Sequence, residues 1–278
     1  MTRNLRSEEV GTPTIARRRV WPLVTALLAG LLALGILAMC LGNYQVAPST
    51  VAKILVGQIP GIHADVTWPR AVETVVLQVR LPRTLGAMCV GAALALSGAT
   101  YQGVFRNPLV SPDLLGVSAG ACVGAASAIL LHTGRASLQV MALATGLAAV
   151  ALATFIPRLL RNTSTMTLIL SGVIVAGLMN STLGLLKYIA DPETELADIT
   201  YWMMGSFSLI KGSELLMVAP VMALAATILF AIRWRINLLS LGDQQAKSLG
   251  VSLRSTRLTT IVCSTALTGC AVCISGTV

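Results

Sequence analysis

The sequence predicts an all-α fold, a polytopic bundle of transmembrane helices. Of its 278 residues, 55% are hydrophobic and only 11% are charged, and the mean hydropathy is +0.80. A soluble domain carries roughly 25% charged residues, which keep its surface wet. The charges are also unevenly spaced, and several intervals between them reach the ~20 apolar residues that a helix needs to cross a bilayer. Most of the surface is therefore expected to face lipid.

Seven charge-poor segments are long enough to be membrane spans, and the first lies in the charge-free interval Val20–Ala52. A further apolar run, Tyr201–Ile210, is too short to cross and is expected to lie at the interface or dip back into the bundle. Residues 1–19 form a polar tail before the membrane domain of residues 20–278. The predicted spans are Trp21–Leu41, Thr84–Phe105, Leu114–Leu131, Ala136–Ile156, Met166–Leu186, Leu215–Ile232 and Leu258–Val278.

The placement of Lys and Arg predicts the orientation of these spans. If the N-terminus is cytoplasmic, 13 of the 20 basic residues lie on the inner side and seven on the outer side. Cytoplasmic connections carry the excess of Lys and Arg in membrane proteins. The net charge of +9 is thus explained by membrane topology, and no nucleic-acid partner is expected.

Small residues predict close packing between helices. Gly116, Gly120 and Gly124 recur at every fourth position, a spacing that lets two helix backbones approach closely. Before them, Arg106–Asp113 contains two prolines, which predict a rigid turn because proline cannot continue the preceding helix. Asp113 is placed to stabilise the N-terminus of the next helix through its macrodipole.

The predicted spans lack the residues that several classes of function require. Every acidic residue lies in the tail, a loop or a span edge, and both histidines lie in or beside outer loops. Cys270 and Cys273 have the spacing of a metal or redox pair, but no second pair lies near them, so apolar packing is the better interpretation. No GxxxxGK[ST] phosphate loop and no HExxH motif occurs. We therefore expect no enzyme activity, metal or cofactor, and energy for transport would come from a partner.

Four sequence blocks, in order, resemble the FecCD family, the permeases of bacterial ABC importers for ferric siderophores, haem and vitamin B12. They are Val79–Leu85 (VRLPRTL), Val90–Gly98 (VGAALALSG), Phe105–Leu109 (FRNPL) and Leu114–Gly120 (LLGVSAG). Tyr201–Gly205 (YWMMG) and Leu241–Val251 (LGDQQAKSLGV) extend the likeness. It covers the chain from about residue 20 to its end.

The resemblance implies a ten-span architecture, of which about seven spans are present here, so the chain is expected to be C-terminally truncated. It also implies partners: a second permease subunit in a homo- or heterodimer, a cytoplasmic ABC ATPase dimer, an extracytoplasmic substrate-binding protein and the lipid bilayer. The expected function is to move a ferric siderophore, or haem or cobalamin, across the bacterial inner membrane into the cytoplasm. The N-terminus is expected to be cytoplasmic.

The resemblance further implies a coupling element that contacts the ATPase, within the cytoplasmic segment of about residues 233–257. We expect a short polar helix there, capped by Asp243, with Ala246 and Leu249 on one face. The alternative is an ordinary amphipathic loop. The predicted coupling residues are Gly242, Asp243, Gln244, Gln245, Ala246, Leu249 and Gly250.

Arg80 and Arg83 are predicted to dock the binding protein. They lie on the outer side, against the positive-inside bias, with Pro82 stiffening a turn between them. The resemblance implies that these arginines pair with carboxylates of the binding protein, a geometry that guanidinium groups suit. The alternative is that both side chains snorkel to lipid headgroups.

Two gates are implied along the transport pathway. Ser164, Thr165 and Met166 match the cytoplasmic gate, where small hydroxyl groups and one flexible apolar side chain could close behind a bulky chelate. A second gate would include Tyr201, Trp202, Met203, Met204 and Gly205, for which an interfacial aromatic belt is the alternative.

Two other classes of function remain open. An ion-coupled secondary transporter would keep its activity without any ATPase and lose it with the ion gradient. A non-transporting membrane scaffold would contact no binding protein. The sequence does not choose the substrate, and a siderophore is favoured only because it is common among relatives.

Overall fold

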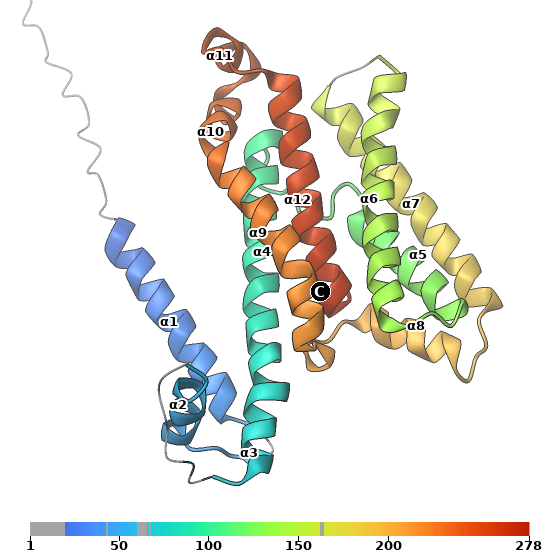
Figure 1. Ribbon diagram of the computed structural model, residues 1–278. Helices are drawn as coiled ribbons and strands as arrows, with labels where there is room; N and C mark the ends of the chain where they lie inside the picture. The colour runs from blue at the N-terminus through green and yellow to red at the C-terminus, as the bar shows by residue number, and fades with distance from the viewer. Residues whose placement is uncertain (1–19, 43, 60–65, 67, 162–163, 278) are drawn as a thin grey trace, which may run out of the picture.

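The computed structural model of the chain (Figure 1) describes residues 20–42, 44–59, 66, 68–161 and 164–277. The predicted tail of residues 1–19 lies outside them. In this described part the regular elements are all helical, with α1 (Val20–Cys40), α2 (Pro48–Val56), α3 (Arg70–Thr74), the π-helix η1 (Val75–Arg80), α4 (Leu81–Phe105), α5 (Val117–Leu130), α6 (Arg135–Leu159), α7 (Thr165–Ile189), α8 (Glu195–Met204), the 3-10 helix η2 (Phe207–Leu209), α9 (Gly212–Ala231), α10 (Arg233–Leu241), α11 (Asp243–Ser248) and α12 (Leu253–Ser275).

Six helices of the described residues are long and apolar enough to cross a membrane, which confirms the predicted transmembrane bundle. They are α1, the continuous helix Arg70–Phe105, α6, α7, α9 and α12. The predicted span Leu114–Leu131 is shorter than expected, because α5 has only 14 residues. At 1.5 Å per residue it extends about 21 Å, less than the ~30 Å of a hydrocarbon core. The preceding residues form turns before α5 begins.

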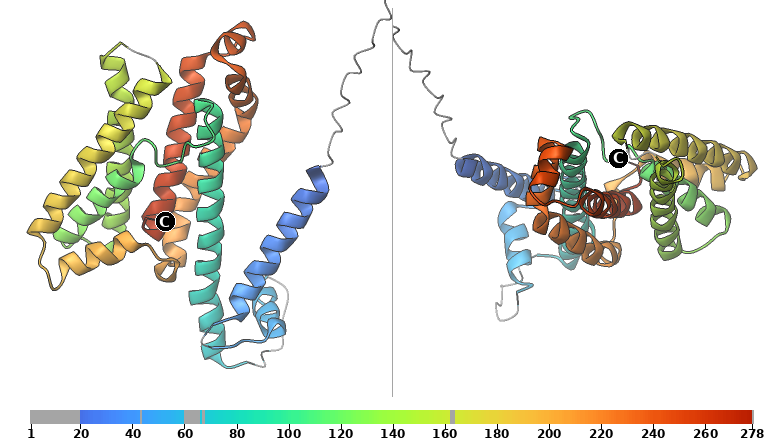
Figure 2. Two further views of the ribbon diagram at one scale, coloured as in Figure 1. Left: turned by 180° about the vertical axis from the view of Figure 1, so that it is seen from behind. Right: turned by 90° about the horizontal axis from the view of Figure 1, so that it is seen from above.

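Helix α12 is the centre of the bundle. It contacts α4 and α9 on one side and α5 and α6 on the other, and 78% of its most apolar window is buried (Figures 1 and 2). By contrast, α1 stands at the edge of the molecule, where only 17% of the corresponding window is buried. The most hydroxyl-rich span therefore lies inside the protein, and the more uniformly apolar α1 has most of its side chains exposed on the surface.

Hydroxyl side chains join α12 to α4. Ser97 donates to the Ser264 carbonyl oxygen at 3.0 Å and lies 2.8 Å from the Thr268 hydroxyl oxygen. One turn along, the hydroxyl oxygens of Thr100 and Ser264 are 2.6 Å apart. Because lipid offers no alternative hydrogen-bond partner, such pairs favour one packing of the two helices.

The helix that contains the RLPR sequence continues through its proline. A turn at Pro82 was expected, but η1 and α4 form one continuous helix. The Leu81 N–H donates to the Val76 carbonyl five residues earlier, the pattern of a π-helix. This wider turn precedes Pro82, which has no N–H to donate, and accommodates it within the helix.

Two of the three predicted packing glycines bring α5 against α6. A Cβ atom at Gly120 would lie 2.7 Å from the Thr145 carbonyl oxygen, and one at Gly124 would lie 2.7 Å from the Met141 carbonyl carbon. Gly116 has a different role, because it caps α5 at a φ of +78° and lies against Ala176 of α7. As predicted, Asp113 supports the start of α5, where its carboxylate accepts from the Ser118 N–H at 2.7 Å.

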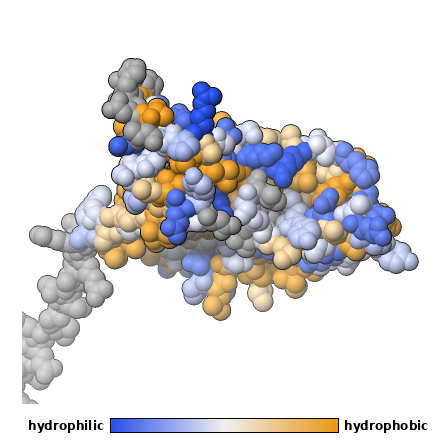
Figure 3. All heavy atoms as spheres, turned by 90° about the horizontal axis from the view of Figure 1, so that it is seen from below, coloured by the Kyte–Doolittle hydropathy of each residue, from blue (hydrophilic) through white to orange (hydrophobic). Residues whose placement is uncertain are grey.

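The bundle has two ends that differ in their elements. The α11 end carries α11, the last residues of α4 and α6, and the first residues of α7 and α12. The opposite end carries α2, α3 and α8 (Figure 1). Figure 3 views this second end and shows hydrophilic side chains spread among hydrophobic ones. This end thus exposes polar groups, as the alternation of spans and charged connections predicts.

Candidate functional site

The predicted coupling segment, residues 233–257, is helical and not an extended loop. It comprises α10, α11 and the first turn of α12. Gly242 separates α10 from α11 at a φ of +129°, a backbone conformation that side-chain-bearing residues rarely adopt. The glycine thereby lets α11 leave the direction of α10.

Asp243 is not the helix cap that was expected. Gly242 occupies the cap position, and the Asp243 carboxylate is bound by two arginines. Arg257 of α12 donates to its two oxygens at 2.8 and 3.0 Å, and Arg106 donates at 3.3 Å. Charge-assisted hydrogen bonds of this kind are the stronger ones in proteins. Asp243 therefore ties α11 to the end of α4 and to the start of α12.

Ala246 and Leu249 do not share a face. Ala246 is fully buried in the core beside α10 and α12, whereas the Leu249 side chain is 59% exposed. The reason is that α11 has only six residues and ends at Ser248, so Leu249 lies beyond the regular helix. Gln244, Gln245 and Gly250 are also exposed. The exposed surface of the α11 region is thus formed by Gln244, Gln245, Lys247, Ser248, Leu249 and Gly250, and its contact with an ATPase stays a prediction.

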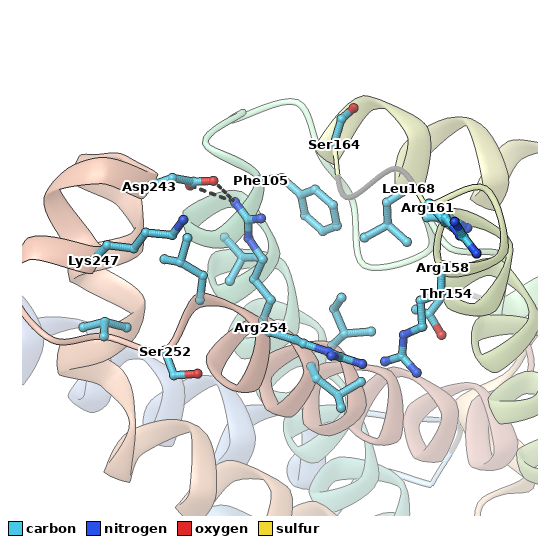
Figure 4. A pocket seen from close by; sticks show the side chains of 17 residues that line it. Phe105, Thr154, Arg158, Arg161, Ser164, Leu168, Asp243, Lys247, Ser252 and Arg254 are labelled. Carbon is cyan, nitrogen blue, oxygen red and sulfur yellow. Dashed lines mark hydrogen bonds and ion pairs between the residues drawn. The ribbon is translucent and has the colours of Figure 1, made fainter.

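A cavity of about 790 Å³ opens at the α11 end (Figure 4). Asp243 and Lys247 of the coupling element line it from one side, and Ser164 of the predicted cytoplasmic gate lines it from the other. The structure therefore brings these two predicted regions to one cavity. Met166 is 73% exposed and is not among the lining residues, and Thr165 is the first residue of α7. Ser164 caps α7, with its hydroxyl oxygen accepting from the Thr167 N–H at 3.3 Å.

The cavity also gathers cations that sequence reasoning counted only toward membrane orientation. Arg158 lies in the last turn of α6 and Arg161 in the turn that follows it, and Arg254 and Arg257 come from α12. Their only signal in the sequence is a basic cluster at each span edge, which is typical of any cytoplasmic loop. Their convergence depends on the packing of α6 beside α12 and was not predictable from either cluster.

The predicted second gate lies against the end of α12. The Ser206 N–H donates to the Ser275 carbonyl oxygen at 2.7 Å, and a Cβ atom at Gly276 would lie 2.8 Å from the Gly205 Cα atom. Trp202 packs against buried residues of two core clusters. The remaining members diverge, since Tyr201 and Met204 are 71% and 72% exposed and the Met203 carbonyl accepts from Thr277. Their role as a gate stays a prediction.

Arg80 and Arg83 differ in exposure. Arg80 is only 9% exposed, and it donates to the Met39 carbonyl oxygen at 2.6 Å, to that of Cys40 at 3.2 Å and to that of Tyr44. It thereby holds the end of α1 against the long helix. Arg83 is exposed. Docking through this pair stays a prediction, in which Arg83 is the accessible member and Arg80 would first have to release these carbonyl groups.

Comparison with known proteins places the chain in a family. Residues 30–278 match the FecCD transport family. The chain belongs to that family. It is 37% identical over 243 residues to the Molybdate import system permease protein MolB of Haemophilus influenzae, an alignment that covers 87% of this chain and 71% of the relative. It is 38% identical over 210 residues to the Probable iron chelatin transport system permease protein of Helicobacter pylori, with 75% of this chain and 63% of the relative covered.

The structural comparison agrees with the sequence comparison. A solved ABC transporter described as of metal-chelate type, in an inward-facing conformation, superposes with a TM-score of 0.80 at 35% identity. The match covers 92% of this chain and 77% of that chain. These findings confirm the resemblance inferred from the four sequence blocks. The chain spans 71% and 63% of the lengths of the two curated relatives above.

Proposed function

We propose that the chain is a membrane-spanning permease subunit of an ABC importer. The observation that carries this proposal is the α11 region within a FecCD-family bundle: a short helix, fixed to two spans through Asp243, with Leu249 exposed beyond its end. A partner ATPase that contacts this region would move α11, and the ion pairs would transmit the movement to α4 and α12. A second permease subunit, a cytoplasmic ATPase dimer and an outer binding protein complete the proposed assembly.

The proposed cargo is a ferric siderophore or a related metal chelate. The relative from Helicobacter pylori named above supports this class. Haem and cobalamin, which other permeases of similar sequence are named for, remain candidates within it. The molybdate permease extends the range of candidates to a small metal oxyanion. A competition experiment decides among these candidates. Uptake of radioactive iron chelate is measured in the presence of each unlabelled candidate, and the cargo that the binding protein prefers should inhibit it most.

Coupling is tested by substituting the exposed residue of the α11 region. Leu249→Asp should abolish co-purification of the ATPase and leave membrane insertion intact, because the side chain is 59% exposed and not part of the core. Leu131→Asp is the matched control, since Leu131 is 65% exposed at the opposite end of the bundle. An ATPase-to-permease ratio that is the same in both variants and in the unmodified chain would refute the coupling assignment.

The two rival classes are tested by the energy source and by the partner. Uptake into vesicles that contain the full assembly should require ATP and persist after the ion gradients are dissipated. Uptake that survives removal of the ATPase and stops with the gradient would instead identify a secondary transporter. Absence of any binding-protein contact and of any uptake would favour a scaffold.

A further inference from the structure

The basic side chains that line the cavity at the α11 end outnumber its one carboxylate, that of Asp243. Asp243 is engaged by Arg257 and by Arg106. For Arg158, Arg161, Lys247 and Arg254, the described part of the chain provides no side-chain hydrogen bond or ion pair. Figure 4 shows the Arg158 and Arg254 side chains reaching toward one another from α6 and α12. Like charges that face each other are unfavourable unless an anion lies between them.

The first turns of two helices also direct backbone N–H groups toward this place. Helix α12 begins at Leu253, and the Ser252 side chain makes no capping hydrogen bond, so the first N–H groups of that helix remain available beside the cavity. Helix α7 also begins here, after Ser164. The N-terminus of a helix attracts anions. Helices α4 and α6 end at the same place with the opposite polarity, and Arg158 in the last turn of α6 offsets that of α6.

A second, apolar cavity continues from the first along the membrane-spanning part of α6 and α12. It has a volume of about 640 Å³, and its lining includes Leu147, Ala151 and Val262. The two cavities share Thr154, Arg158, Leu258 and Ile261. Positive charge at the level of the span ends is thus joined to an apolar groove at the depth of lipid chains.

We propose that this combined site binds an acidic phospholipid. Its phosphate lies between Arg158 and Arg254, and one acyl chain lies in the groove between α6 and α12. Basic pockets between transmembrane helices recognise anionic headgroups, and guanidinium groups suit phosphate because they donate two parallel hydrogen bonds. A free oxyanion would satisfy the arginines but would leave the apolar groove without a role. A general excess of Lys and Arg at the span ends would explain the positive charge of the cavity. It would not explain why an apolar groove continues from that cavity.

The site is tested by lipid retention. The purified chain is incubated with phosphatidylglycerol or phosphatidylcholine in detergent, and bound lipid is counted by native mass spectrometry. We expect one retained phosphatidylglycerol per chain and at least tenfold weaker retention in the double variant Arg158→Gln/Arg254→Gln. Arg158→Lys/Arg254→Lys should restore part of the binding. The control Arg233→Gln/Arg235→Gln removes the same charge from α10, outside the cavity, and should retain the lipid.

Two further arms separate the lipid from its alternatives. Ala151→Trp fills the groove from an exposed position and leaves the basic side chains of the cavity in place. This variant should release phosphatidylglycerol. Inorganic phosphate or molybdate at millimolar concentration should not displace the lipid. Displacement by either ion, together with retention in Ala151→Trp, would overturn the lipid assignment in favour of a free oxyanion. An equal loss of phosphatidylglycerol in Arg158→Gln/Arg254→Gln and in the control Arg233→Gln/Arg235→Gln would mean that only general surface charge is involved. That result would overturn the site.

Discussion

Adding one methyl group to α5 should separate it from α6. In Gly124→Ala the new Cβ atom would lie 2.7 Å from the Met141 carbonyl carbon and closer still to the Met141 oxygen and the Thr145 hydroxyl. Real Cβ atoms essentially never approach other atoms within 3.0 Å. Two of the three obstructing atoms belong to the α6 backbone, so no side-chain rotation relieves the contact. The helices themselves must move apart.

The magnitude follows from two opposing effects. Overpacking in a close-packed interior costs typically ~1–3 kcal/mol. Replacing glycine by alanine within a helix returns at most ~1 kcal/mol. Gly124→Ala should therefore lower the free energy of unfolding by roughly 1–2 kcal/mol. Gly184→Ala in α7 is the matched control, because no atom lies within 4 Å of its new Cβ atom. It should leave the stability unchanged or raise it slightly.

The assay is unfolding by dodecyl sulfate in mixed micelles, followed by tryptophan fluorescence. Trp202 is a suitable reporter because it packs in the cluster that contains Ala121 and Ala125 of α5. The unfolding midpoint of Gly124→Ala should fall below that of Gly184→Ala. If both variants unfold at the same midpoint, or Gly124→Ala is the more stable, the close backbone approach of α5 and α6 is not what fixes this interface.

Three other predictions concern charged groups. Asp243→Asn removes the ion pairs that hold α11. Because the carboxylate is 40% exposed, the local stability of α11 should fall by about 1 kcal/mol or less. Amide hydrogen exchange in α11 should then be faster than in the unmodified chain. Unchanged exchange in α11 would contradict the role of Asp243 as its anchor. Arg80→Gln should lower the free energy of unfolding by roughly 2 kcal/mol, because buried hydrogen bonds from a charged group are lost, whereas Arg83→Gln should have little effect. Equal melting temperatures of these two variants would argue against a structural role for Arg80. Arg83→Glu should weaken binding-protein affinity in nanodiscs about tenfold, with Arg83→Lys near the unmodified value. Unchanged affinity would leave Arg83 as a lipid anchor.

The membrane spans were predictable because hydropathy is a local property of the chain. Charge-free runs alone located six helices, five of them within about five residues of their observed bounds, α6 and α9 among them. The sixth, predicted as Thr84–Phe105, begins earlier, at Arg70, because the charged segment before it is also helical. The family resemblance was likewise carried by short contiguous blocks such as VRLPRTL and was confirmed by comparison. Packing glycines in α5 were recognisable from their spacing, although the sequence did not say that Gly116 differs from Gly120 and Gly124.

Other features depend on residues that are distant in the sequence. Arg80 is buried because the end of α1, about 40 positions earlier, offers it carbonyl oxygens. Asp243 is an anchor and not a cap because Arg106 approaches it across 137 positions.

By itself, then, the sequence determined the class of protein, its spans and its family, since these follow from composition, spacing and contiguous motifs. Only the tertiary structure decided how its charges are used. A local pattern gives the position of an arginine along the chain but not its distance from the groups that neutralise it. The cations of the α11 end illustrate this: Arg158 and Arg254 are 96 positions apart, and only the packing of α6 beside α12 brings them to one cavity.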